Sequence, residues 1–174
     1  MKKILIIISL LFILFLLIRN EETLMIPEES IRFRVIANSN LKEDIEAKEY
    51  LVNEIMNNES NIFSANSIED TREKINDNIE NVKKVVSNTF KKINYNKNYN
   101  IKYGINYFPE KNYKGVKYKS GYYESLVITI GEGNGNNYWC VMFPPFCMID
   151  EEKLDDAEYK FKIAEIFEKY IIKK

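Results

Sequence analysis

The sequence predicts an α+β fold in which a mainly antiparallel sheet packs against helices. Alternating or β-branched apolar residues gather in the second half of the 174-residue chain. Apolar residues at helical spacing occur in the first half and again near the end. The resulting element order, β-α-α-β-β-β-β-α, lacks the regular alternation of strand and helix that builds a parallel α/β sheet.

The first twenty residues predict a signal peptide or an N-terminal membrane anchor. Residues 4–18 are apolar except for Ser9, and Lys2 and Lys3 precede them. As a helix this run would be about 22 Å long, against a bilayer hydrocarbon core of roughly 30 Å. That length suits a signal peptide, although no small-residue cleavage site follows. We expect residues 1–20 to direct export, whether they are cleaved or retained.

An acidic spacer, residues 21–30, should lead to a single domain over residues 31–174. Ile31–Ala37 alternates between apolar and basic side chains and predicts a strand. Leu41–Asn57 has an apolar stripe at helical spacing and predicts a helix. We expect Asn40 to cap this helix, with Glu43 in the capping-box position.

A second, longer helix should begin at Ser67 or Asp70 and end near Lys92. Its apolar residues recur at steps of three, four and seven, but the stripe is too short for a coiled coil. We interpret it as a face that packs within the domain. The stripe consists of Ile68, Ile75, Ile79, Val82, Val86, Phe90 and Ile93.

Strands are expected at residues 99–107, 116–118, 122–130 and 138–143. The last two should form a hairpin around the Gly/Asn-rich turn at residues 131–137. A final helix should follow, with the acidic residues 150–152 in its first turn. Its expected apolar face consists of Leu154, Ala157, Phe161, Ala164, Ile166, Phe167 and Ile171.

The composition excludes several classes of function. The chain has no histidine, which excludes Ser-His-Asp and Cys-His catalysis. Its net charge is −1, and loss of Lys2, Lys3 and Arg19 with the first 20 residues would make it −4. An acidic chain argues against nucleic acid as a partner. The glycine loop lacks the Lys-Ser/Thr pair of a phosphate loop. We therefore expect no catalytic residues, cofactor, metal or small-molecule substrate.

Cys140 and Cys147 are the only cysteines. An even pair in an exported chain favours a disulfide, because the compartments outside the cytosol are oxidising. Closing so short a ring would stabilise the fold by about 2–3 kcal/mol. The alternative is a pair of buried free thiols that only pack.

Aromatic and proline residues cluster around these cysteines. Such clusters usually belong to a core, but the prolines stop sheet pairing and would hold aromatic side chains on a rigid loop. Rigid, exposed aromatic residues are typical anchors of protein interfaces, so this loop is also the expected partner-binding surface. It consists of Tyr138, Trp139, Phe143, Pro144, Pro145 and Phe146.

Two blocks of sequence carry a resemblance to a known family. IRFRVIANSN follows the N-terminal apolar segment, and GEGNGNNYWCVMFPPFC precedes the last helix. With these blocks, residues 31–150 resemble the stage II sporulation protein R family of endospore-forming bacteria. The resemblance implies a non-enzymatic signal, made in the forespore and exported into the space between the forespore and mother-cell membranes. It also implies a partner, a membrane-bound aspartic protease of the mother cell, whose activation leads to cleavage of a sigma factor precursor.

Two other functions remain open from the residues alone. One is an envelope or cell-wall hydrolase that uses acidic residues. It would need a concave site with a pair of carboxylates whose pKa values are perturbed. The other is a structural domain anchored in the envelope.

Overall fold

A computed structural model describes residues 24–172, apart from residue 27, residues 114–115 and residues 150–153. The expected signal or anchor at residues 1–20 therefore lies outside the described part of the chain. Among the described helices, none has the length and apolar character that crossing a bilayer requires.

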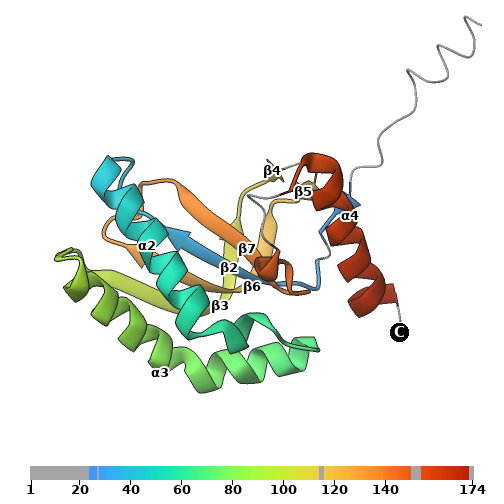
Figure 1. Cartoon of the computed structure of the whole chain (residues 1–174), viewed down its shortest axis with the longest axis horizontal. Coiled ribbons are helices and arrows are strands. Elements are labelled where there is room, and N and C mark those ends of the chain that lie inside the picture. Colours follow the sequence, from blue (N-terminus) through green and yellow to red (C-terminus); the bar gives the residue numbers. More distant parts are fainter. Residues whose placement is uncertain (1–23, 27, 114–115, 150–153, 173–174) are drawn as a thin grey trace, which may run out of the picture.

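The larger sheet has four strands in the order β3-β6-β2-β7 (Figure 1). These strands are β2 (Ile31–Ile36), β3 (Tyr99–Phe108), β6 (Gly121–Ile130) and β7 (Asn137–Phe143). The pairs β3–β6 and β2–β7 are antiparallel, whereas β2 runs parallel to β6. The α+β class is thus confirmed, with a mixed and mostly antiparallel sheet.

The smaller sheet has the order β1-β5-β4, with β1 (Leu24–Met25), β4 (Lys111–Tyr113) and β5 (Val116–Tyr118). The short strand expected at residues 116–118 is therefore present. β4 was not predicted from the sequence, and β1 lies within the segment that was expected to be a spacer. Ile26, next to β1, is only 2% exposed, so part of the expected spacer packs into the fold.

The expected hairpin between β6 and β7 is wrong, because β2 lies between them and pairs with both. The side chains of Ile31, Phe33 and Val35 in β2 are fully buried, which suits a central strand rather than an edge. The Gly/Asn-rich residues 131–136 begin with a turn closed by the Gly133 amide, which donates to the Ile130 carbonyl at 3.0 Å, and then cross the end of β2 instead of forming a hairpin loop.

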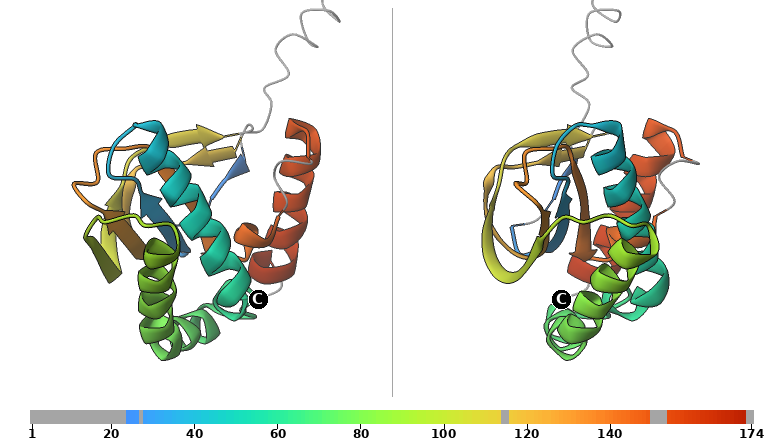
Figure 2. Two further views of the ribbon diagram at one scale, coloured as in Figure 1. Left: turned by 60° about the vertical axis from the view of Figure 1, so that its left-hand side comes forward. Right: turned by 90° about the vertical axis from the view of Figure 1, so that its left-hand side faces the viewer.

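Helices α2 (Lys42–Asn58) and α3 (Ile68–Lys92) cover one face of the larger sheet (Figures 1 and 2). A short 3-10 helix, η1 (Ser60–Phe63), connects them. Ser67 caps α3, since its side chain accepts a hydrogen bond from the Asp70 amide at 3.0 Å. The largest core lies between the helices and the sheet and includes Phe33, Val35, Leu51, Ile55, Leu126 and Ile128.

The apolar stripe of α3 faces this core, as the sequence predicts. Its most deeply buried residues are Ile75, Val82, Val86 and Phe90. The stripe expected on α2 is less accurate, because Leu41 is 69% exposed and precedes the helix.

The last helix, α4 (Asp156–Phe167), continues into a π-helical turn, η4 (Glu168–Ile172), and packs against the smaller sheet. Asp155 caps it in a capping box with Glu158. The acidic residues 150–152 lie outside the described part of the chain, and the described helix starts after them.

The predicted apolar face of α4 is wrong for Ala157 and Ala164, which are exposed, and for Phe161, which is 68% exposed. The helix instead buries Tyr159, Ile163 and Phe167, spaced four residues apart. Phe161 is two residues from both Tyr159 and Ile163, about 200° around the helix, and so points to the opposite side.

The loop after β2 holds the Gly/Asn segment through an interlocked set of hydrogen bonds, here called the clamp. It joins residues 37–40 to residues 131–136. Backbone amides of the second segment donate to the Asn38 side chain (from Glu132, 3.0 Å), the Asn38 carbonyl (from Asn134, 3.0 Å) and the Ala37 carbonyl (from Gly135, 2.9 Å).

Asn40 belongs to this clamp and does not cap α2, so that prediction is wrong. Its side-chain oxygen accepts from the Asn136 amide at 2.8 Å, and Leu41 occupies the N-cap position without a side-chain bond. Gly135 is required by close approach, because a Cβ there would lie 2.2 Å from the Ser39 carbonyl oxygen. Gly131 is required by its φ of +53°.

A buried carboxylate, Asp44, holds the clamp in place through hydrogen bonds to two of its residues, Asn38 and Ser39. It is 3% exposed and accepts hydrogen bonds from Asn38 Nδ2 (2.8 Å), Ser39 Oγ (2.5 Å) and Tyr95 Oη (2.5 Å). The Ser39 bond, followed by the Tyr95 bond, lowers the pKa of Asp44. The clamp, α2 and the segment after α3 are therefore tied together at one charged group.

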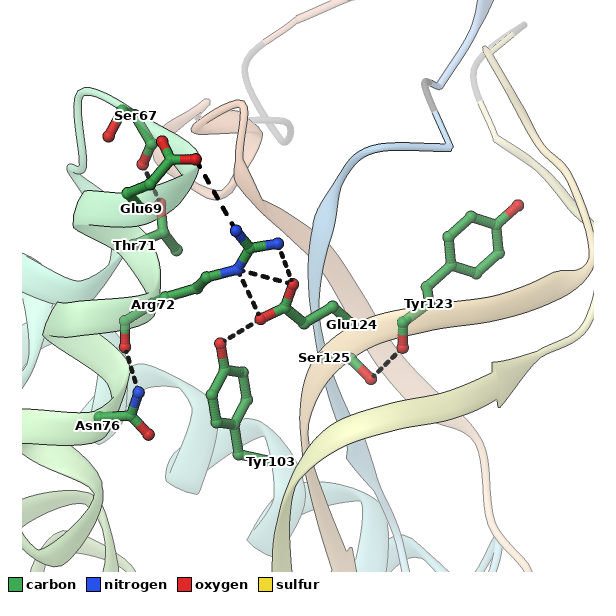
Figure 3. A network of polar contacts seen from close by, with 9 residues as sticks. All are labelled: Ser67, Glu69, Thr71, Arg72, Asn76, Tyr103, Tyr123, Glu124 and Ser125. Atoms are coloured by element: carbon green, nitrogen blue, oxygen red, sulfur yellow. Dashed lines mark hydrogen bonds and ion pairs between the residues drawn. The ribbon is translucent and has the colours of Figure 1, made fainter.

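A second polar network joins α3 to the sheet (Figure 3). Arg72 donates from Nη2 and Nε to Glu124 of β6, at 2.8 and 3.0 Å. The Tyr103 hydroxyl donates to the other carboxylate oxygen at 2.5 Å. The Arg72 bond is the largest cause of a lowered pKa at Glu124, and burial raises the pKa of Tyr103.

Replacing Glu124 with glutamine should lower the free energy of unfolding by about 1 kcal/mol at pH 7. The effect is modest because the Arg72 side chain is 45% exposed and water screens the pair. Since the folded carboxyl has a lowered pKa, its contribution is present above pH ~4.3 and disappears as the pH falls through the folded pKa. Urea unfolding at pH 7 and pH 3 checks this. A loss of the same size at both pH values would contradict it.

Candidate functional site

Burial divides the aromatic and proline cluster around the cysteines into two groups. Phe143 and Phe146 are 8% and 2% exposed, and Pro144 is also buried. Phe146 packs edge-to-face on Phe167 of α4, with ring centroids 5.3 Å apart. These three residues therefore belong to the core. Tyr138, Trp139 and Pro145 are only partly buried, and the expected partner-binding role stays a prediction that now concerns them.

Cys140 and Cys147 form a disulfide, and both are buried. The bond links β7 to the 3-10 turn η2 (Phe146–Met148). The alternative of two free thiols is wrong. The disulfide holds the turn that follows β7 against that strand, and Cys140 lies one residue after Trp139.

A small hollow lies beside Trp139, between the two sheets. It has a volume of about 160 Å³, well below the roughly 300–1,000 Å³ typical of small-molecule pockets. Its size suits one side chain of another molecule. The hollow is lined by Asn137, Tyr138 and Trp139 of β7, Lys111 and Tyr113 of β4, and Tyr118 of β5.

The three lining residues of β7 are consecutive. Asn137 and Trp139 share the face of Arg34 and Ile36, their partners in β2, whereas Tyr138 is paired with Val35 on the other face. β7 is the last strand of its sheet, with β2 as its only strand partner among the described residues. The hollow therefore lies against a sheet edge.

The ring of Trp139 lies close to two cations. Lys111 Nζ is 5.3 Å from its centroid, and Arg34 Cζ is 5.4 Å away. Both distances are within the range of cation–π attraction. With the Asn137 amide turned so that its oxygen faces these donors, that oxygen accepts from Arg34 Nη2 at 2.9 Å and from the Trp139 indole at 3.3 Å. Burial lowers the pKa of Arg34.

A third cation, Arg32, lies deeper on the same face of the sheet. It is 1% exposed, and its guanidinium carbon is 3.3 Å from the ring centroid of Tyr123. Neither Nη1 nor Nη2 has a hydrogen-bond acceptor among the described residues. Burial lowers the pKa of Arg32. The sequence placed Arg32 and Arg34 opposite the apolar face of β2, but it gave no sign that this second face is covered.

A hydrolase that uses acidic residues would need a pair of carboxylates in a concave site. Glu43 and Glu46 border a shallow hollow of about 250 Å³ on α2, and both are exposed. Among the described residues, the two most buried carboxylates are Asp44 and Glu59. They are fifteen residues apart on or next to α2, or about 22 Å along a helix, too far to act as a pair. The described residues include no group of three or more potential metal ligands.

Comparisons with known proteins give a consistent result. A sequence model of the family described as Stage II sporulation protein R matches residues 27–153. The Stage II sporulation protein R of Bacillus subtilis (strain 168) is 33% identical over 131 residues, which cover 74% of this chain. The same region covers 58% of that relative, so the chain matches less than two thirds of its length. No solved structure matches the chain significantly.

Proposed function

Because this chain belongs to the stage II sporulation protein R family, which has a role in sporulation, we propose that it is an exported intercellular signal. It leaves the forespore by means of residues 1–20 and acts in the space between the two membranes, either free or tethered. There it activates a membrane-bound aspartic protease of the mother cell, which then cleaves the sigma factor precursor. The observation that carries this proposal is the family match over residues 27–153.

Two structural features support a role in protein binding. The disulfide and the clamp hold the last strand and its connections in place, which suits a domain that works outside the cell. The hollow beside Trp139 has the size of a side chain and borders a sheet edge, where another chain can add a strand.

Activation by such a signal must arise from differential binding. A ligand shifts a protease from an inactive to an active state only by as much as it binds the active state more tightly. A shift from 1% to 99% active requires about a 10⁴-fold preference. The contacts of this domain should therefore be made mainly with the active form of the protease.

The test is co-expression in a host that does not sporulate. The full chain, the candidate aspartic protease and the sigma factor precursor are produced together, and cleavage of the precursor is scored on immunoblots. We expect cleavage only when all three are present, and none when the catalytic aspartate of the protease is replaced. Precursor that stays intact beside a folded, exported chain would overturn the proposal.

Replacing Trp139 with alanine should reduce cleavage in this assay at least tenfold, because central aromatic anchors commonly contribute 2 kcal/mol or more to binding, about thirtyfold in affinity. Tyr122→Ala is the matched control, since Tyr122 is a 75% exposed aromatic residue that does not line the hollow. Thermal unfolding of both variants verifies that they are folded. Full activity of folded Trp139→Ala would show that this residue is not part of the interface.

A further inference from the structure

Three cations are arranged along two aromatic rings on the second face of the larger sheet. The guanidinium carbons of Arg32 and Arg34 lie 5.4 and 5.6 Å from the ring centroid of Phe108. Phe108 and Trp139 pack edge-to-face at 5.2 Å, and Lys111 Nζ lies 5.3 Å from the Trp139 ring. Positive charge thus extends from the buried Arg32 to Lys111 at the hollow.

The two arginines have no counter-charge in the described part of the chain, where no carboxylate lies within 4.0 Å of either guanidinium. Arg34 donates to neutral acceptors, the Asn137 side chain at 2.9 Å and the Tyr107 carbonyl at 3.4 Å. Arg32 lacks acceptors for Nη1 and Nη2. Buried cations are normally paired with an anion, so Arg32 and Arg34 carry positive charge that no carboxylate of the described residues compensates, in a chain whose net charge is negative.

We propose that the hollow beside Trp139 binds the carboxylate of an aspartate or glutamate carried by an extended segment of a partner protein. The acidic group would lie near Lys111 and in the field of Arg34, and its charge would offset the positive charge of the two arginines. This proposal rests on the proposed function in one respect only, the identity of the partner protein that carries the acidic segment.

The shape of the site favours an extended peptide over a small anion. β7 is the last strand of its sheet and borders the hollow, so a partner strand can pair with that edge while one of its side chains enters the hollow beside Trp139. The Trp139 ring provides an apolar wall for the methylene groups of that side chain, and Lys111 provides a donor for the carboxylate.

Trp139 is the only tryptophan, so its fluorescence reports on this site in the full chain purified in detergent. The probe is a blocked peptide, Val-Glu-Val-Glu-Val, compared with its glutamine counterpart, Val-Gln-Val-Gln-Val. We expect saturable binding of the glutamate peptide, about fivefold weaker binding of the glutamine peptide, and weaker binding of the glutamate peptide at high salt. Equal binding of the two peptides, or no binding, would overturn the proposal.

Variants of Lys111 test whether the peptide binds at the hollow beside Trp139. Lys111→Gln should weaken binding of the glutamate peptide about fivefold, whereas Lys111→Arg should retain it. Lys117→Gln is the matched control, because Lys117 lies on the adjacent strand and pairs with Glu110 at 3.2 Å. Equal effects of Lys111→Gln and Lys117→Gln would point to general surface charge and overturn the site. Inorganic phosphate that displaces the peptide at equal concentration would indicate a simple anion site, with the same consequence.

A failure of the peptide-binding experiment and a failure of the cleavage assay have different consequences. If precursor cleavage requires the chain but the peptides do not bind, the carboxylate site is wrong and the signalling proposal stands. If the peptides bind as expected but no cleavage occurs, the site stands and the partner must be another protein.

Discussion

Replacing Asp44 with asparagine should lower the free energy of unfolding by about 2–3 kcal/mol at pH 7. Both carboxylate oxygens of Asp44 accept hydrogen bonds, from Asn38 and Ser39 on one side and from Tyr95 on the other. An asparagine retains an acceptor on one side only, and its amide group would face donors on the other. Because the site is almost fully buried, water cannot replace the lost bonds.

The loss should depend on pH in a defined direction. The hydrogen bonds from Ser39 and Tyr95 lower the pKa of Asp44 in the folded state relative to the unfolded chain. A group with a lowered folded pKa contributes stability that is fully present above its unfolded pKa of about 3.9. That contribution is lost as the pH falls through the folded pKa. The difference in the free energy of unfolding between the wild type and Asp44→Asn should therefore become smaller below about pH 4.

Urea unfolding followed by circular dichroism at pH 7 and pH 3 measures both effects. Glu43→Gln serves as the control, because Glu43 is the exposed neighbour of Asp44 in the same helical turn. We expect Glu43→Gln to stay within about 0.5 kcal/mol of the wild type. The prediction would be wrong if Asp44→Asn matched Glu43→Gln at pH 7.

The clamp that Asp44 supports also shows which parts of the fold can be predicted from sequence and which cannot. Local signals were sufficient for α3, whose apolar spacing and Ser67 cap lie within one stretch of chain. They were also sufficient for most strands and for the cysteine pair. The clamp joins residues 37–40 to residues 131–136, which are more than ninety positions away. Asn40 therefore looked like a helix cap, and its actual partner was not visible in its local sequence.

The same reasoning explains why the order of the strands was missed. β6 and β7 are separated by a short Gly/Asn segment, and a hairpin is the usual outcome of that pattern. The hairpin does not form because β2 occupies the place between β6 and β7. Its fully buried Ile31, Phe33 and Val35 favour that central position. A choice between a hairpin and an inserted strand depends on tertiary packing, which propensity does not include.

The candidate site was only partly predictable. The sequence drew attention to Trp139 and its neighbours, but it could not separate the buried Phe143 and Phe146 from the partly exposed Trp139. Lys111 and Arg34 were not expected there, because β4 was not predicted and the alternation in β2 gives no sign that its second face is covered. The cationic character of the site arises only when two sheets are brought together.

Replacing both cysteines with alanine should lower the free energy of unfolding by about 2–3 kcal/mol. The disulfide closes a ring between positions seven residues apart, and the chain-entropy argument gives this value for so short a loop. The bond also retains Phe146, which is 2% exposed and packs on Phe167 of α4. Its loss should loosen the contact between η2 and α4, while the larger core between the sheet and α2 and α3 is retained.

Urea unfolding with and without dithiothreitol distinguishes the bond from the side chains. Reductant should shift the unfolding midpoint of the wild type towards that of the double variant and leave the variant unchanged. The oxidised wild type should also resist thiol alkylation until reductant is added. If reductant changes the unfolding midpoint of neither protein, the disulfide ring contributes nothing measurable to stability, and packing alone holds η2 against β7. In that case the edge beside Trp139 would keep its shape in a reducing compartment, and export would not be needed to form the binding surface.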